Sequence, residues 1–175
     1  MNPLLQTLHS RTSVRKYTDR PLSNEELETL IKAGMAAPTA GNKQPWAFLV
    51  ITEKETLKAL ADCLPYAGFT KDAPAAIVVC GDPKKGFQGE EEPLWIQDCS
   101  AATENILIAC EAMGLGATWT AVHPLAEREE SVRKILGIPG GVIPFNVIPV
   151  GEPAHRPKPK EKWNPDNLHW ERWGS

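Results

Sequence analysis

The sequence predicts one globular domain of mixed helices and strands, and three observations lead to this fold class. The chain has 175 residues, 42% hydrophobic and 23% charged, which suffices for one buried core. Segments with the spacing of amphipathic helices alternate with short apolar runs. Glycine and proline residues stand between these segments, where turns are expected. We therefore expect a single domain over residues 1–175, with residues 151–175 as an extended C-terminal arm.

Two helices near the N-terminus carry clear start signals. Asn2 and Pro3 form a good N-cap and first-turn pair, and three leucines follow at helical spacing. Ser23 and Glu26 form a capping box in front of apolar residues that recur every three or four positions. The second helix is expected to end at residues 36–38, because Pro38 cannot continue it.

Short apolar runs predict the strands. Residues 47–51 and 75–80 are continuous apolar runs too short for helices, which indicates strands buried on both faces. Residues 117–122 and 145–150 are also predicted to be strands. Residues 81–93 are rich in glycine, proline, lysine and glutamate, so they are expected to form a surface excursion.

Three further helices are predicted in the rest of the chain. Thr52 and Glu55 form a second possible capping box, before a helix that reaches Leu64. Residues 94–113 have helical length and are apolar on most sides, so they predict a central helix buried within protein. Because its polar face is so small, we expect it to pack against a second subunit as well. Residues 126–136 predict the last helix.

Two polar segments are candidate ligand-binding sites. The loop at residues 37–46 places side-chain hydrogen-bonding groups beside exposed backbone, although a plain helix-to-strand turn explains it equally well. In the segment that follows the first helix, an extended backbone would project Arg11, Ser13 and Arg15 to one side. Such a set suits a phosphate dianion. The alternative for this segment is a solvated basic turn.

Composition and charge argue against several partner classes. The formal net charge of −3 does not favour nucleic-acid binding. No run of 18 apolar residues occurs, so membrane insertion is not expected, and the N-terminus lacks the pattern of a signal peptide. We therefore expect a cytoplasmic protein. The cysteines form no C-x-x-C pair and are expected to be buried free thiols; they are Cys63, Cys80, Cys99 and Cys110.

Familiar catalytic and nucleotide-binding motifs are absent from the sequence. The four histidines lack the spacing of metal ligands, so no metal site is expected, and no serine lies in a G-x-S-x-G setting. Residues 114–119, G-L-G-A-T-W, lack the third glycine of a dinucleotide fingerprint and follow a helix instead of opening one. Phosphate-friendly loops without an obvious acid, base or nucleophile suggest that a bound cofactor carries the chemistry.

Five segments, taken in order and at similar spacing, resemble the FMN-dependent nitroreductase family. They are R-T-S-V-R at residues 11–15, the loop at 37–46, Q-D at 97–98, G-L-G-A-T-W at 114–119 and P-K-P-K-E-K-W at 157–163. The resemblance covers essentially the whole chain. It implies an α+β fold with a central, mostly antiparallel β-sheet surrounded by helices. It also implies an intertwined homodimer that binds two FMN molecules at its interface.

The resemblance further implies a set of FMN-binding residues in four segments. They are Arg11, Thr12, Ser13, Arg15, Pro38, Thr39, Ala40, Asn42, Thr120, Ala121, Val122, Lys160 and Lys162. Arg15 is expected to reach the pyrimidine edge of the flavin, and the loop at 37–46 to come from the other subunit. A backbone N–H near Ala121 or Val122 would face flavin N5, and the bulk of Val122 would narrow the substrate space. The two lysines would bind phosphate, and Lys162 stands where the family often has arginine, so it lacks the bidentate fork.

The implied activity is ping-pong electron transfer without catalytic side chains. NADH or NADPH would reduce FMN, and a small acceptor such as a nitroaromatic compound or a quinone would then reoxidise it. Other flavin chemistry remains open on the same scaffold, namely enone reduction, reductive dehalogenation or breakdown of the flavin. A dimeric flavin-binding protein without significant turnover is a further alternative.

Overall fold

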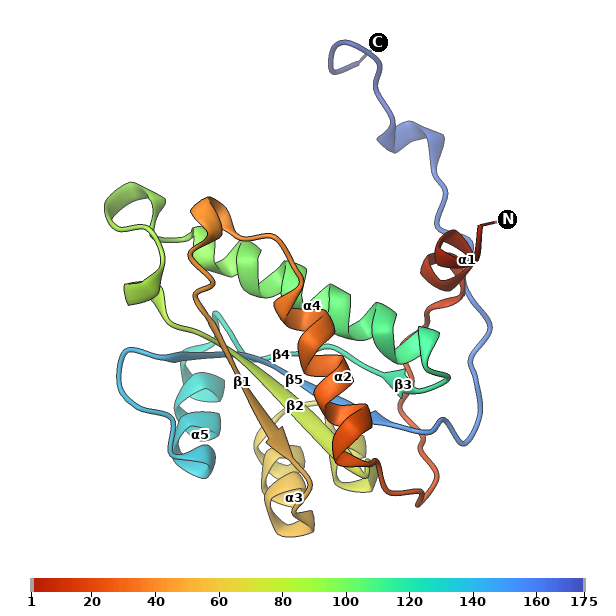
Figure 1. Ribbon diagram of the computed structural model, residues 1–175, viewed down its shortest axis with the longest axis vertical. Helices are drawn as coiled ribbons and strands as arrows, with labels where there is room; N and C mark the ends of the chain where they lie inside the picture. The colour runs from red at the N-terminus through yellow and green to blue at the C-terminus, as the bar shows by residue number, and fades with distance from the viewer. Residues whose placement is uncertain (1, 175) are drawn as a thin grey trace.

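A five-stranded antiparallel sheet forms the centre of the computed structural model, which describes residues 2–174 (Figure 1). The strands are β1 (Trp46–Ile51), β2 (Ala75–Gly81), β3 (Gly116–Ala117), β4 (Thr120–Ala121) and β5 (Ile143–Gly151). Their order is β1-β2-β5-β3, and β4 also pairs with β5. All of these pairs are antiparallel. The expected α+β fold with a central antiparallel sheet is confirmed.

Helices cover both faces of this sheet. The α-helices are α1 (Pro3–Ser10), α2 (Asn24–Met35), α3 (Lys54–Cys63), α4 (Leu94–Ala112) and α5 (Ala126–Leu136), and all but α1 pack on a face of the sheet. Figure 1 shows α2 and α4 on one face and α3 and α5 on the other, while α1 lies near one end of α4. Within residues 2–174, no helix has the length and apolar character needed to cross a membrane.

Local capping explains where the first two helices begin. The Asn2 side chain accepts the Leu4 N–H at 2.9 Å, and Pro3 occupies the first turn of α1. At α2 the Ser23 hydroxyl accepts the Glu26 N–H at 3.1 Å, and the Glu26 carboxylate accepts the Ser23 N–H at 2.8 Å. Both predicted helix starts are therefore confirmed.

Two expectations for the next segment are wrong. Thr52 and Glu55 form no capping box, because α3 begins one residue later than expected and takes Glu53 as its N-cap. Strand β1 is not buried on both faces, because it lies at the edge of the sheet, where Val50 is 42% exposed. The position of a strand within a sheet depends on the other strands, and a short apolar run does not reveal it.

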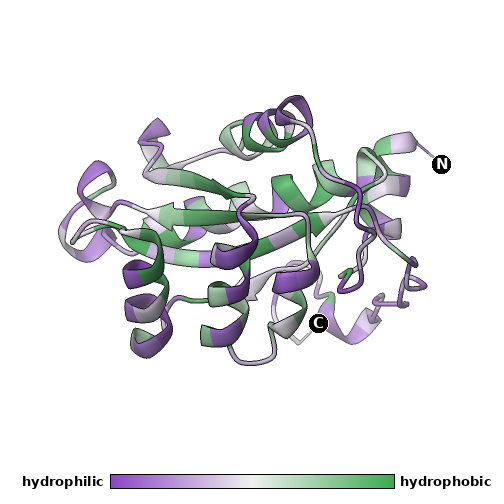
Figure 2. Ribbon diagram, turned by 90° about the horizontal axis from the view of Figure 1, so that it is seen from below, coloured by the Kyte–Doolittle hydropathy of each residue, from purple (hydrophilic) through white to green (hydrophobic). Residues whose placement is uncertain are grey.

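Strand β2 separates two hydrophobic cores by simple alternation. Ala75, Ile77 and Val79 face the core shared with α2 and α4. The residues between them, Ala76, Val78 and Cys80, face the core shared with α3 and α5. All six side chains are fully buried, as expected for a strand covered on both faces. Figure 2 shows hydrophobic residues along the strands and hydrophilic ones on the outer parts of the helices.

The strand expected over residues 117–122 is instead two short strands, β3 and β4. Both pair with β5, but Pro149 of β5 lies between the two paired stretches. Its carbonyl accepts the Thr118 N–H at 3.3 Å, and proline has no N–H to donate in return. The ladder is therefore interrupted at Thr118 and Trp119.

Three of the four cysteines are buried, as expected, but Cys63 is only half-buried. Burial raises the pKa of the Cys80, Cys99 and Cys110 thiols to about 12. These thiols therefore stay protonated near neutral pH and are poor nucleophiles.

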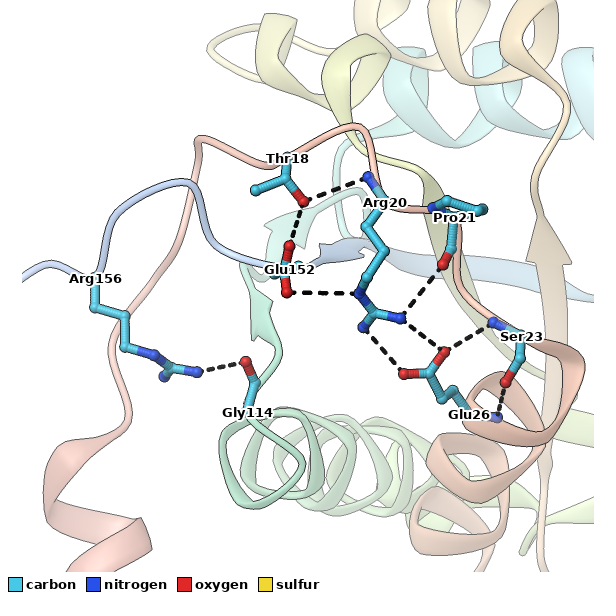
Figure 3. A network of polar contacts seen from close by, with 8 residues as sticks. All are labelled: Thr18, Arg20, Pro21, Ser23, Glu26, Gly114, Glu152 and Arg156. Carbon is cyan, nitrogen blue, oxygen red and sulfur yellow. Dashed lines mark hydrogen bonds and ion pairs between the residues drawn. The ribbon is translucent and has the colours of Figure 1, made fainter.

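A polar network ties the start of α2 to the end of β5 (Figure 3). The Arg20 guanidinium contacts the Glu26 carboxylate at 3.0 Å and the Glu152 carboxylate at 3.6 Å. The Thr18 hydroxyl donates to Glu152 at 2.7 Å. Hydrogen bonds from Arg20, and then from the Ser23 N–H, hold the pKa of the Glu26 carboxyl below its ordinary value of 4.5.

This lowered pKa predicts a pH dependence of stability. Because the fold favours ionised Glu26, its contribution is present above about pH 4.5 and disappears as the pH falls through the lowered pKa. We expect Glu26→Gln to lower the free energy of unfolding near neutral pH and to flatten its acid decline. Urea unfolding over a pH series measures both effects. The control is Glu28→Gln, which removes an exposed carboxylate paired with Lys32 on the same helix; parallel pH curves for the Glu26 variant and the wild type would contradict the prediction.

Candidate functional site

The two ends of the chain run side by side where they leave the body of the protein. The Thr18 N–H donates to the Glu152 carbonyl at 2.9 Å, and the Ala154 N–H donates to the Lys16 carbonyl at 3.0 Å. Tyr17 and Pro153 form an antiparallel bridge between these two bonds. The residues that precede Lys16 and those that follow Ala154 therefore diverge from one point and face each other.

The N-terminal segment is fixed against β3. Ser13 forms a parallel bridge with Ala117, whose carbonyl accepts the Val14 N–H at 3.0 Å. The Val14 carbonyl accepts two hydroxyl groups, from Tyr17 at 2.7 Å and from Thr118 at 2.5 Å. Burial raises the pKa of Tyr17, so its hydroxyl stays protonated and able to donate. These bonds hold residues 11–15 as an extended segment.

An open groove of about 1080 Å³ lies between this segment and the C-terminal arm. One wall consists of residues from the end of α1 and the segment after it: Gln6, Leu8, His9, Ser10, Arg11, Thr12, Ser13 and Arg15. The other wall is the arm itself: Pro157, Lys158, Pro159, Lys160, Glu161, Lys162 and Trp163. The first wall carries two arginines and the second three lysines. We call this feature the basic groove.

The basic groove brings together the cationic residues that the sequence singled out. Arg11, Thr12, Ser13 and Arg15 lie on one wall, and Lys160 and Lys162 lie on the other. Cationic forks, hydroxyl groups and flexible ammonium groups facing one space form a suitable donor set for a phosphate dianion. The residues present therefore fit the phosphate end of FMN.

The two arginines of the groove have different settings. Arg11 is largely buried and contacts Glu104 of α4 at 3.5 Å, which fixes its position. The Arg15 guanidinium lies over the Phe69 ring, 5.8 Å from its centroid. Arg11 is thus held by its ion pair with α4, whereas the Arg15 guanidinium lies over the aromatic ring of Phe69.

The loop at residues 37–46 does not line this groove. Its Ala40 N–H donates to the buried Asp98 carboxylate on α4 at 2.9 Å. Gly41, Asn42 and Gln44 all have left-handed backbone, with φ values of 54°, 55° and 51°. Left-handed backbone at non-glycine residues is uncommon and clusters at ligand-binding loops. In a single chain, this loop and the basic groove are separate features.

The four loop residues that were expected to bind FMN also lie apart from the basic groove. Pro38, Thr39, Ala40 and Asn42 all lie between α2 and β1, beside the first half of α4. The Thr39 hydroxyl accepts the Gln44 N–H at 3.2 Å, which helps to close the loop. None of these four residues lines the basic groove of the single chain.

The segment expected near flavin N5 also differs in part from expectation. The Val122 N–H donates to the Phe145 carbonyl at 3.2 Å, so it cannot also face a ligand. The Val122 side chain is fully buried in the core with α3 and α5, so its bulk does not narrow any open space. Thr120 and Ala121 lie on β4, with Ala121 exposed.

Several residues of the groove were missed by sequence reasoning. Lys158 belongs to the same alternating pattern as Lys160 and Lys162, and an extended arm places all three on one side. This alternation in the sequence could therefore have indicated Lys158. Ser10 and His9 lie at the end of α1, and no local pattern distinguishes them from ordinary helix-end residues.

The arm carries large exposed aromatic side chains at the end of the groove and beyond it. Trp163, Trp170 and Trp173 are 69%, 70% and 91% exposed in the single chain. Figure 1 shows the arm passing α1 and then extending away from the sheet. Within one chain, these three tryptophan side chains are therefore not buried against another surface.

Comparisons with known proteins agree with this architecture. A family model described as the nitroreductase family matches residues 8–64 and 57–152. A protein of Archaeoglobus fulgidus is 41% identical over 99% of this chain and 100% of its own length, and its name is "Putative NADH dehydrogenase/NAD(P)H nitroreductase". A crystal structure from Parabacteroides distasonis with the same name has a TM-score of 0.94 at 46% identity, covering 99% of this chain and 100% of that one. The structure of an FMN-dependent nitroreductase from Clostridium difficile has a TM-score of 0.88 at 27% identity, covering 97% and 99% of the two chains.

Proposed function

Because this chain belongs to the nitroreductase family, we propose that it binds FMN and passes electrons from NADH or NADPH to a small acceptor such as a nitroaromatic compound or a quinone. The basic groove is the observation that carries this proposal. It joins cationic groups from both ends of the chain around one space of about 1080 Å³. No catalytic side chain is needed, because bound FMN supplies the hydride- and electron-accepting ring.

In this proposal, different residues of the groove bind different parts of FMN. Arg11, Ser13, Lys160 and Lys162 hold the phosphate through charge-assisted hydrogen bonds. Arg15 places a positive charge near the pyrimidine edge, where it favours electron uptake by the ring. Thr12 and the backbone of Thr120 and Ala121 are further proposed contacts.

The proposed assembly is a homodimer in which each FMN touches both subunits. Exposed apolar side chains support it, because α1 presents Leu4, Leu5 and Leu8 at 62%, 49% and 43% exposure beside the tryptophan-bearing arm. In a dimer, Pro38, Thr39, Ala40 and Asn42 of one subunit complete the groove of the other. Sedimentation of the purified protein tests the assembly, and a monomer that binds FMN would contradict it.

We also propose a cytoplasmic location. All four cysteines are free, including the half-buried Cys63. Free thiols are typical of reducing compartments. Fractionation of the cells that make the protein tests this location.

The test of the activity uses the purified protein. We expect a yellow protein that releases FMN on denaturation. Anaerobic addition of NADH and of NADPH in separate experiments should bleach the flavin absorbance, and nitroaromatic or quinone acceptors should restore it. The rates with each nucleotide decide the preferred reductant, and an acceptor panel separates this activity from enone reduction, dehalogenation and flavin breakdown.

Two outcomes would contradict the proposal. A colourless protein that cannot be reconstituted with FMN would show that the basic groove does not bind FMN. A protein that binds FMN but oxidises neither nucleotide with any acceptor would favour a flavin-binding role without turnover.

A further inference from the structure

One carboxylate joins the two walls of the basic groove. Glu111 lies in the last turn of α4, and its side chain is 13% exposed. One carboxylate oxygen accepts the Ser10 hydroxyl at 2.9 Å, and the other accepts an N–H of the Arg156 guanidinium at 3.0 Å. A second N–H of Arg156 donates to the Gly114 carbonyl at 2.5 Å, just beyond the end of α4 (Figure 3).

The two hydrogen-bond partners of Glu111 each directly precede, along the chain, the part of one wall that carries its cationic residues. Ser10 is the last residue of α1 and directly precedes Arg11. Arg156 directly precedes Pro157, where the arm begins to line the groove. Glu111 itself is not among the lining residues, so it touches each wall without facing the groove.

The two walls differ in how firmly they are otherwise attached. The arginine wall is also held by the bonds of Val14 to Ala117 and Thr118. On the arm, the contacts of Arg156 are the bonds to the body that lie nearest to the lysines along the chain. The position of the three lysines therefore depends strongly on Arg156, and through it on Glu111.

We propose that Glu111 is a positioning residue that sets the spacing of the two cationic walls and thereby the affinity of the groove for FMN. This role rests on the proposed function. A groove whose walls are already in place binds a phosphate more tightly than one that must order a flexible arm on binding. Glu111 acts through Ser10 and Arg156 and contacts no ligand itself.

The first test compares FMN affinity among matched variants. Glu111→Gln keeps the size of the side chain, but an amide cannot accept from both walls as the carboxylate does. We expect it to raise the dissociation constant of FMN by about tenfold, as loss of a charged hydrogen bond does. Arg156→Gln should have the same effect. The control is Glu130→Gln, which removes an equally charged residue from an ion pair on α5.

A double-mutant cycle separates positioning from general destabilisation. If Glu111 acts through the lysines, Lys160→Ala should weaken FMN binding less in the Glu111→Gln background than in the wild type. Independent effects, in which the two fold-changes multiply, would contradict the positioning role. Thermal unfolding of each variant verifies that it is folded at the temperature of the binding assay.

A readout without FMN separates this role from the proposed function. Trypsin can cut after Lys160 and Lys162 in the flavin-free protein, and a released arm should be cut several-fold faster in Glu111→Gln than in Glu130→Gln. Equal cutting rates would contradict the attachment by Glu111 even if FMN binds. A wild-type chain that binds no FMN, with faster cutting in Glu111→Gln, would contradict the proposed function and the effect of Glu111 on FMN while leaving the attachment established.

Discussion

Replacing both Arg11 and Lys160 with alanine should weaken FMN binding by about 100-fold or more. The two residues come from opposite walls of the basic groove. A hydrogen bond to a charged group contributes about 1.5–3 kcal/mol, and about 1.4 kcal/mol corresponds to a factor of ten. Losing one such bond from each wall therefore gives a change of this size. Fluorescence titration of the flavin-free protein with FMN measures it.

The same double variant should fold almost as stably as the wild type. Arg11 contacts Glu104, whose side chain is 49% exposed, and such a partly solvated ion pair contributes roughly 0–1 kcal/mol. Lys160 lies on the exposed arm. We therefore expect the free energy of unfolding to fall by no more than about 1 kcal/mol.

A matched control distinguishes the effect of removing positive charges from the groove from the effect of removing positive charges elsewhere on the protein. Lys32→Ala with Lys134→Ala removes two cations from ion pairs on α2 and α5, with side chains that are 75% and 74% exposed. This control should leave FMN affinity nearly unchanged. Comparable losses of affinity and of folding stability in the Arg11 and Lys160 variant would favour a structural role for these charges.

Local signals in the sequence predicted the helices well. The cap at Asn2 and the capping box of Ser23 and Glu26 involve residues close together in the chain, and both are present. Strand β2 was recognisable because both of its faces are buried, which gives a continuous apolar run. These features depend on neighbouring residues or on burial alone.

Features that depend on distant residues were not predictable in this way. The break between β3 and β4 arises opposite Pro149, and the exposure of Val50 follows from the place of β1 at the sheet edge. The amide of Val122 is taken by Phe145, on the neighbouring strand. No local pattern encodes such pairings.

The candidate site was likewise predictable from the sequence only in part. The resemblance to the nitroreductase family indicated some residues of each groove wall, namely Arg11, Thr12, Ser13 and Arg15 on one and Lys160 and Lys162 on the other, and these line one space in the structure. It gave no indication of Glu111, whose partner Arg156 lies 45 residues away. A carboxylate that positions other residues has no motif of its own, because its role exists only in the folded chain.

Gly116→Ala should lower the free energy of unfolding by about 1–3 kcal/mol, the usual range for overpacking a filled site. A Cβ atom at this position would lie 2.6 Å from both Cβ and Cγ2 of Val14 and 2.8 Å from its Cγ1. Val14 is 1% exposed, and its branched side chain has little freedom to rotate away. Either β3 or the segment that carries Val14 must move. Urea unfolding of the flavin-free protein measures the cost.

The control for this substitution is Gly140→Ala. A Cβ atom there would meet nothing within 4 Å, and the backbone is not in the left-handed region. Because alanine restricts the unfolded chain more than glycine does, this variant should be neutral or slightly more stable. Equal changes in the two variants would show that the close approach of Gly116 to Val14 has no energetic consequence.

The Gly116→Ala variant also tests what the Gly-Leu-Gly segment at residues 114–116 contributes to the site. Gly114 has φ of 76° just after α4, and Gly116 lets the N-terminal segment lie directly against β3. If this contact sets the position of the arginine wall, Gly116→Ala should weaken FMN binding as well as stability, whereas Gly140→Ala should change neither appreciably. A loss of stability with unchanged FMN affinity would confine Gly116 to packing. A loss of both would make Gly116 part of the scaffold that holds Arg11, Ser13 and Arg15 in the groove.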